Sequence, residues 1–229
     1  MRRLVMISTL LAVLGLAIFW VVTAPRPLAA SAVAGLAGDA RRGEAVFWAG
    51  GCASCHAAPE AKGDALLLLS GGQRFPSPFG TFLAPNLSPD PRHGIGGWSL
   101  LDLANAMTRG VSPDGRHYFP AFPYASFIHA SLQDVADLKA FLDTLPASAT
   151  PSRPHEVPFP FNIRRSLGGW KLLFLREPWV ISGDLTPAEQ RGRTLVEALG
   201  HCGECHTPRN LLGGMDKSQI GRASCRERV

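Results

Sequence analysis

The chain has 229 residues, of which 46% are hydrophobic and 18% are charged, and its formal net charge is +5. A charged fraction below the roughly 25% of an average globular domain, together with this apolar content, excludes a disordered or nucleic-acid-coating polymer. The length allows one large domain or two small ones.

The N-terminal segment has the pattern of an export signal. Arg2 and Arg3 precede an uncharged apolar run over residues 4–24, which is longer than the roughly 7–15 residues of a signal peptide and approaches the roughly 20 that cross a bilayer. We therefore expect residues 1–32 to be a membrane anchor, with cleavage near Ala30-Ser31-Ala32 as the alternative. Because the two arginines stay cytoplasmic, the rest of the chain is predicted to be exported.

A first domain is predicted over residues 33–150, and its class is all-α. Its helices show a helical period of apolar residues between recognisable start and stop signals. These signals are Gly50 and Gly110 just past helix ends, Ser99 with Asp102 and Ser131 with Asp134 at helix starts, and Pro146 after the last helix.

An extended connector and a second domain follow. Residues 151–182 contain five prolines, which favour an extended path, with a short helix near Trp170. Shifting the chain by 150 residues superimposes Arg41 on Arg191 and two cysteine motifs on each other, so the domain is duplicated. Residues 183–219 are predicted to begin a second, truncated domain of the same class. Thr186, Pro187 and Glu189 provide its first helix cap.

The two motifs have the sequence Cys-x-x-Cys-His. The first is Cys52, Cys55 and His56, and the second is Cys202, Cys205 and His206. Two thiols three positions apart on a helical turn can bind the two vinyl groups of one porphyrin, and the adjacent imidazole can ligate its iron. A redox Cys-x-x-Cys, a zinc ribbon and structural disulfides are the alternatives, but none of them requires a histidine after each pair. We therefore predict two covalently bound haem c groups, with His56 and His206 as proximal iron ligands.

The last ten residues differ from the rest. Residues 220–229 have no apolar period, and they resemble the in-frame translation of a sequencing adapter, so we exclude them, including Cys225, from the fold. This tail and the two N-terminal arginines together account for +4 of the net charge of +5. The basic character of the chain therefore predicts no nucleic-acid partner.

Several segments are similar to one known family. They are Pro78–Phe82, Ala84–Asn86, Gly94–Trp98, Ser112–Gly115 and Cys202–Asn210. They resemble the multihaem cytochrome c subunits of periplasmic membrane-bound alcohol and gluconate dehydrogenases, and related dihaem cytochromes, over residues 36–218. The resemblance implies tandem cytochrome c domains, and it implies a distal methionine where this chain has Phe122, or further on where it has Ala130.

The distal ligand of the first haem is therefore not obvious. Haem c takes a methionine or a histidine as its second axial ligand. We favour His129, which lies next to one of the two family positions, ahead of Met107, His117 and His93, and an open iron is a further alternative. Met215 follows His206 by nine residues, which is too short a loop to reach the opposite face of the second haem.

The function predicted is electron transfer, and no catalytic residues are expected. The chain would be an exported dihaem cytochrome of the bacterial periplasm, anchored to the inner membrane by residues 1–32. Its donor would be a periplasmic dehydrogenase or a small redox donor, and its acceptor a terminal oxidase, a quinone or another cytochrome. The alternative is a haem enzyme with an open first haem, acting on a peroxide or a sulfur compound.

Overall fold

The computed structural model describes residues 1–216. It is mainly helical, with a single two-stranded sheet in the described part. The elements are α1 (Arg2–Val22), η1 (Ala30–Val33), α2 (Ala40–Ala49), α3 (Cys52–His56), η2 (Gly63–Leu67), β1 (Arg74–Ser77), β2 (Gly80–Leu83), α4 (Leu100–Ala104), η3 (Asn105–Arg109), α5 (Tyr124–Phe127), α6 (Leu132–Leu142), α7 (Ser166–Phe174), α8 (Pro187–Arg193), η4 (Thr194–Leu199) and α9 (Gly203–His206). The predicted adapter-derived residues 220–229 lie outside the described residues.

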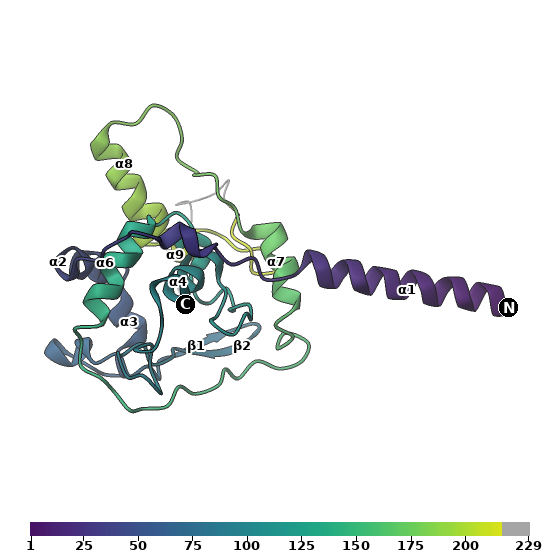
Figure 1. Cartoon of the computed structure of the whole chain (residues 1–229), viewed down its shortest axis with the longest axis horizontal. Coiled ribbons are helices and arrows are strands. Elements are labelled where there is room, and N and C mark those ends of the chain that lie inside the picture. The colour runs from purple at the N-terminus through teal and green to yellow at the C-terminus, as the bar shows by residue number, and fades with distance from the viewer. Residues whose placement is uncertain (217–229) are drawn as a thin grey trace.

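The N-terminal helix α1 projects from the rest of the molecule as a single straight rod (Figure 1). None of its residues is buried, and it is long and apolar enough to cross a membrane. A signal sequence near the N-terminus passes the same test of length and composition.

The main core lies between α2 and α6. Phe47 of α2 is fully buried and packs on Phe141 of α6, with 5.2 Å between ring centroids. Gly43 makes the close approach of the two helices possible, because a Cβ there would overlap the backbone carbonyl of Asp137. α2 is thereby held at a fixed place, and α3 follows it directly.

A buried carboxylate ties the same two helices together. Asp137 of α6 accepts hydrogen bonds from Arg42 Nε at 2.6 Å, from the backbone N–H of Asp39 at 2.8 Å and from Gln133 Nε2 at 2.9 Å. The Arg42 guanidinium is the main reason that the pKa of Asp137 is lowered to about 2. The carboxylate is therefore charged and fully partnered at neutral pH, as a buried charge must be.

The predicted helix caps are confirmed. Ser99 and Asp102 form a capping box at the start of α4, and Ser131 accepts from the backbone N–H of Asp134 at the start of α6. Gly110 ends η3 in the left-handed conformation. Local hydrogen bonding decides these ends, which is why they can be read from a few neighbouring residues.

One feature departs from the all-α prediction. Strands β1 and β2 pair as an antiparallel hairpin, in which Arg74 is opposite Leu83 and Ser77 is opposite Gly80. The hairpin is held from the connector, because Thr81 exchanges two backbone hydrogen bonds with Glu156 and Arg74 forms an ion pair with the Glu156 carboxylate. A two-residue turn between short strands has no long period, so the sequence pattern did not reveal it.

The connector contacts both the first domain and the residues after it. The predicted short helix is confirmed as α7, which begins at Ser166, earlier than expected. Glu197, 8% exposed, accepts from the backbone N–H groups of Val180 and Ile181, each at 2.7 Å. The capping box of Thr186 and Glu189 at the start of α8 is confirmed. That residues 183–219 begin a second, truncated cytochrome c domain remains a prediction.

We expect Asp137→Asn to lower the free energy of unfolding by about 2–3 kcal/mol, because it leaves buried donors poorly paired. The exposed ion pair of Asp143 with Lys139, at 2.7 Å on the same helix, is the matched control, and Asp143→Asn should cost less than about 0.5 kcal/mol.

Since the pKa of Asp137 is lowered in the folded state, its contribution is complete above about pH 4 and is lost as the pH falls toward 2. Urea unfolding at pH 7 and at pH 3 measures both effects. Equal losses for the two variants would contradict the role given to Asp137.

Candidate haem-attachment site

The first motif lies on the short helix α3, which starts after Gly51 in the left-handed conformation. At 100° per residue, Cys52, Cys55 and His56 share one side of this helix. Ala53, between the two cysteines, is 5% exposed and belongs to the main core. The core therefore fixes the rotation of α3 and presents both thiols and the imidazole on a common side.

The imidazole of His56 is oriented by a hydrogen bond. Its Nδ1 lies 2.9 Å from the carbonyl oxygen of Pro85, which can only accept. The Nδ1–H is therefore the donor, and Nε2 keeps its lone pair for a metal. Burial lowers the pKa of His56, which favours this neutral form.

A turn at Gly71 holds the Pro85 carbonyl in place. The backbone N–H of Gly71 donates to the carbonyl oxygen of His56 at 2.7 Å. Gly71 has a φ of +74°, and a Cβ there would lie 2.7 Å from the carbonyl oxygen of Pro85. The turn thus connects the end of the motif to the group that orients its histidine. Sequence reasoning missed Gly71, and it noted Pro85 only as part of the family resemblance.

The motif cysteines are not paired in disulfides, so their thiols can bind haem. All four motif cysteines are free, including Cys52 and Cys55. Burial raises the pKa of the Cys52 thiol to about 12. A reactive redox cysteine needs a lowered pKa, so this environment disfavours the redox alternative.

The second motif lies on α9, directly after η4. Gly200 follows the end of η4, in the position that Gly50 has after α2, as the repeat predicts. Cys202 and Cys205 are exposed, and His206 ends α9. The loop after the motif folds back, because Arg209 forms an ion pair with the Glu204 carboxylate.

The two motifs are neighbours in space. His201 Nε2, next to Cys202, lies 3.3 Å from the carbonyl oxygen of Gly50, two residues before Cys52. The His201 ring also packs edge-on against Phe127 of α5, with 5.5 Å between centroids. Ser126, the preceding residue, donates to Glu204 at 3.2 Å. Segments 150 residues apart in the sequence thus meet at the two attachment motifs.

An aromatic cluster occupies the first family position for the distal methionine. Phe122 has ring neighbours Tyr118, Tyr124 and Phe127 at centroid distances of 5.9, 6.5 and 5.8 Å. It also packs against the main core. The Phe122 ring has no atom that can ligate iron.

The structure places His129 beside the second motif. Its ring stacks on Trp179 with 4.4 Å between centroids and an interplanar angle of 24°, and Arg193 covers Trp179. His129 also lines a small cavity together with Gly203 of α9.

The other candidate ligands are engaged in the fold. Burial lowers the pKa of His117. Its Nε2 donates to the Thr23 carbonyl at 2.8 Å, and its Nδ1 accepts from Lys171 Nζ at 3.0 Å. Neither ring nitrogen is left for iron or for a haem propionate. Met107 is 5% exposed in the main core. For His93 the structure gives a hydrogen bond from its backbone N–H to Asp90, a contact that does not involve the ring.

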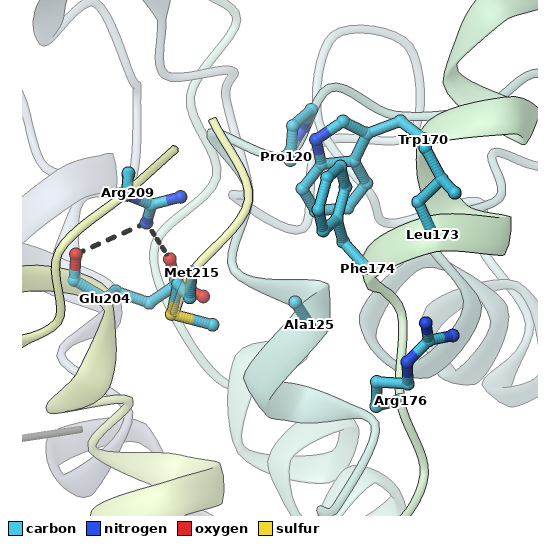
Figure 2. A pocket seen from close by; sticks show the side chains of 9 residues that line it. All are labelled: Pro120, Ala125, Trp170, Leu173, Phe174, Arg176, Glu204, Arg209 and Met215. Atoms are coloured by element: carbon cyan, nitrogen blue, oxygen red, sulfur yellow. Dashed lines mark hydrogen bonds and ion pairs between the residues drawn. The ribbon is translucent and has the colours of Figure 1, made fainter. Parts of the chain in front are cut away.

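A cavity of about 180 Å³ lies between α5, α7 and the loop after α9. Figure 2 shows Trp170 and Phe174 on one side and the Glu204–Arg209 pair with Met215 on the other. Glu204 projects about 200° around α9 from Cys202. This cavity is therefore on the side of α9 away from the second attachment site.

Comparison with known proteins identifies the class. Residues 40–146 match the family model for cytochrome c. The chain is 63% identical over 186 residues to a dihaem cytochrome c-type protein of Cereibacter sphaeroides, covering 81% of this chain and 63% of that protein. It is 39% identical to the fructose dehydrogenase cytochrome subunit of Gluconobacter japonicus, covering 75% of this chain and 35% of that subunit.

A further relative is the cytochrome c subunit of a quinone alcohol dehydrogenase from Gluconobacter oxydans, 36% identical over 80% of this chain and 37% of the subunit. The chain thus spans less than two thirds of the length of these relatives. Residues 40–146 form a cytochrome c domain, and the protein binds haem c covalently. The predicted resemblance to dehydrogenase cytochrome subunits is confirmed.

We expect Gly71→Ala to raise the reduction potential of the first haem. The added methyl group would displace the Pro85 carbonyl, so His56 would lose the hydrogen bond that makes its ring a stronger donor to ferric iron. Gly72→Ala is the matched control, since Gly72 has a φ of +97° but its added Cβ would meet only Pro59 at 3.6 Å. Redox titration of both variants checks this, and equal shifts would point to backbone strain instead.

Proposed function

We propose that this protein is an exported dihaem cytochrome c that carries electrons in the bacterial periplasm, anchored to the inner membrane by α1. It takes electrons from a periplasmic dehydrogenase or a small redox donor. It passes them to a terminal oxidase, a quinone or another cytochrome. The relatives named as dehydrogenase cytochrome subunits support a dehydrogenase as donor.

The observation that carries the proposal is the contact between the two motifs. Each motif can hold one haem, through Cys52, Cys55 and His56 or through Cys202, Cys205 and His206. The His201–Gly50 contact brings the two attachment helices together across 150 residues of sequence. Two haems attached at neighbouring helices form a short path for electrons, as a carrier requires.

The residues around the first motif support this role. Haem iron supplies one-electron redox chemistry when it is bound. His56 is held as a neutral, oriented ligand by Pro85. The core residues beside α3 and the aromatic cluster at Phe122 keep this region apolar, which sets the environment of the haem. The comparisons do not favour the haem-enzyme alternative.

Replacing both cysteines of one motif tests the number of haems. The double variants Cys52→Ala with Cys55→Ala and Cys202→Ala with Cys205→Ala should each remove one of two covalent haems, because no thioether bond to that porphyrin remains. Mass spectrometry of the denatured protein counts the haems. Cys225→Ser, outside both motifs, is the control and should retain both. Two haems in either motif variant would refute that attachment site.

The ligand set of the first haem is tested by spectroscopy. We propose His129 as its distal ligand, so the ferric protein should show no methionine-type charge-transfer band from this haem, and His129→Ala should change its spectrum and raise its affinity for cyanide. Trp179→Leu, which removes the ring stacked on His129, is a control for packing alone. An unchanged spectrum in His129→Ala would exclude His129 and turn attention to Met107 or an open iron.

A further inference from the structure

The C-terminal end of α1 is fixed in a socket made by the haem-binding part of the chain. Thr23, the residue after α1, is 1% exposed. Its carbonyl oxygen accepts from His117 Nε2 at 2.8 Å, and its hydroxyl accepts from Arg165 Nε at 3.1 Å. Gly168 of α7 packs directly on it, since a Cβ at Gly168 would overlap the Thr23 carbonyl.

Arg165 also holds the last turn of α1. Its guanidinium donates to the carbonyl oxygen of Trp20 and lies 4.1 Å from the centroid of the Trp20 ring. A cation at the C-terminus of a helix is stabilised by the free carbonyl groups and the helix dipole. The helix and the domain are therefore joined without a flexible spacer.

The length of the apolar run places this joint at a membrane surface. An apolar run of about 20 residues at 1.5 Å per residue is about 30 Å long, which matches the hydrocarbon core of a bilayer. If the run over residues 4–24 spans the bilayer, Thr23 lies at its edge and Trp20 lies at the level where tryptophan is enriched. The part of the domain around the socket must then touch the lipid headgroups.

That part of the domain exposes large apolar side chains. Phe159 is 78% exposed, and Phe161 and Ile163 are each 45% exposed, in the connector just before Arg165. Leu172, 46% exposed, is four residues after Gly168 and so lies on the same face of α7. Figure 1 shows that the connector turns into α7 at the edge of the domain from which α1 projects, and that α7 runs across the direction of α1.

We propose that Phe159, Phe161, Ile163 and Leu172 form a membrane-contact surface that inserts into the lipid interface beside α1. Exposed apolar and aromatic side chains next to a cationic residue are typical of segments that lie in the interface, about 5–10 Å into the headgroup region. Together with the socket, this surface holds the haem domain against the membrane in one orientation. The inference rests on the proposed membrane anchoring by α1.

The test uses the full chain in lipid vesicles with one labelled cysteine. In a Cys225→Ser background the four motif cysteines are bound to haem, so a polarity-sensitive fluorophore reacts with the introduced cysteine. The three positions are Phe159→Cys for the surface, Leu11→Cys for α1, and Glu44→Cys on α2 as the control. Glu44 is exposed, and α2 lies at the end of the domain opposite α1 (Figure 1).

The ratio of fluorescence in brominated and ordinary lipid is measured for each label, because the ratio cancels quenching by haem. We expect strong quenching at position 11, weaker but clear quenching at position 159, as for an interfacial residue, and no loss at position 44. Quenching at 11 but not at 159 would overturn the membrane-contact surface and leave the anchor in place, and the surface would then face a protein partner.

No quenching at position 11 would overturn both the anchor and the surface. The absorption spectra of each labelled protein, before and after chemical reduction, show whether the haems are retained and redox-active, so loss of the cytochrome function is distinguished from loss of membrane contact.

Discussion

The close packing of α2 on α6 is the constraint on which the first haem site depends. Gly43 lets the two backbones meet, and the buried Asp137 carboxylate joins α6 to Arg42 and to the start of α2. Because α3 follows α2 after only two residues, any shift of α2 would move both cysteines and His56. The apolar contacts supply the free energy, and the charged contact supplies a fixed geometry.

Backbone groups, rather than polar side chains, orient the iron-binding histidine of the first motif. The Pro85 carbonyl sets the tautomer of His56. Gly71 contacts both residues, because its backbone N–H donates to the carbonyl oxygen of His56 and its Cα packs against Pro85. The contact of His201 with the carbonyl oxygen of Gly50 then places the second motif next to the first. A redox centre built in this way needs few polar side chains, which agrees with the low charged fraction of the chain.

The connector does more than join two parts of the chain. Glu156 extends the β hairpin, Arg165 and Gly168 hold the end of α1, and Val180 and Ile181 bind the Glu197 carboxylate. Its prolines predict an extended path, yet a proline-rich segment alone does not reveal which neighbours it contacts. The same limit explains why His117 looked available as a ligand, although it is engaged by Thr23 and Lys171.

The sequence by itself determined the attachment chemistry, the helix caps and the repeat. Each of these depends on residues within one or two helical turns, such as Cys52, Cys55 and His56, or Ser99 and Asp102. Only the tertiary structure decided the partner of His56, the hairpin, the place of His129 beside Trp179 and the socket for Thr23. Apart from the hairpin, whose short strands carry too little pattern to be recognised, these contacts join residues from about 30 to about 140 positions apart. A local pattern carries no information on which distant backbone groups will meet.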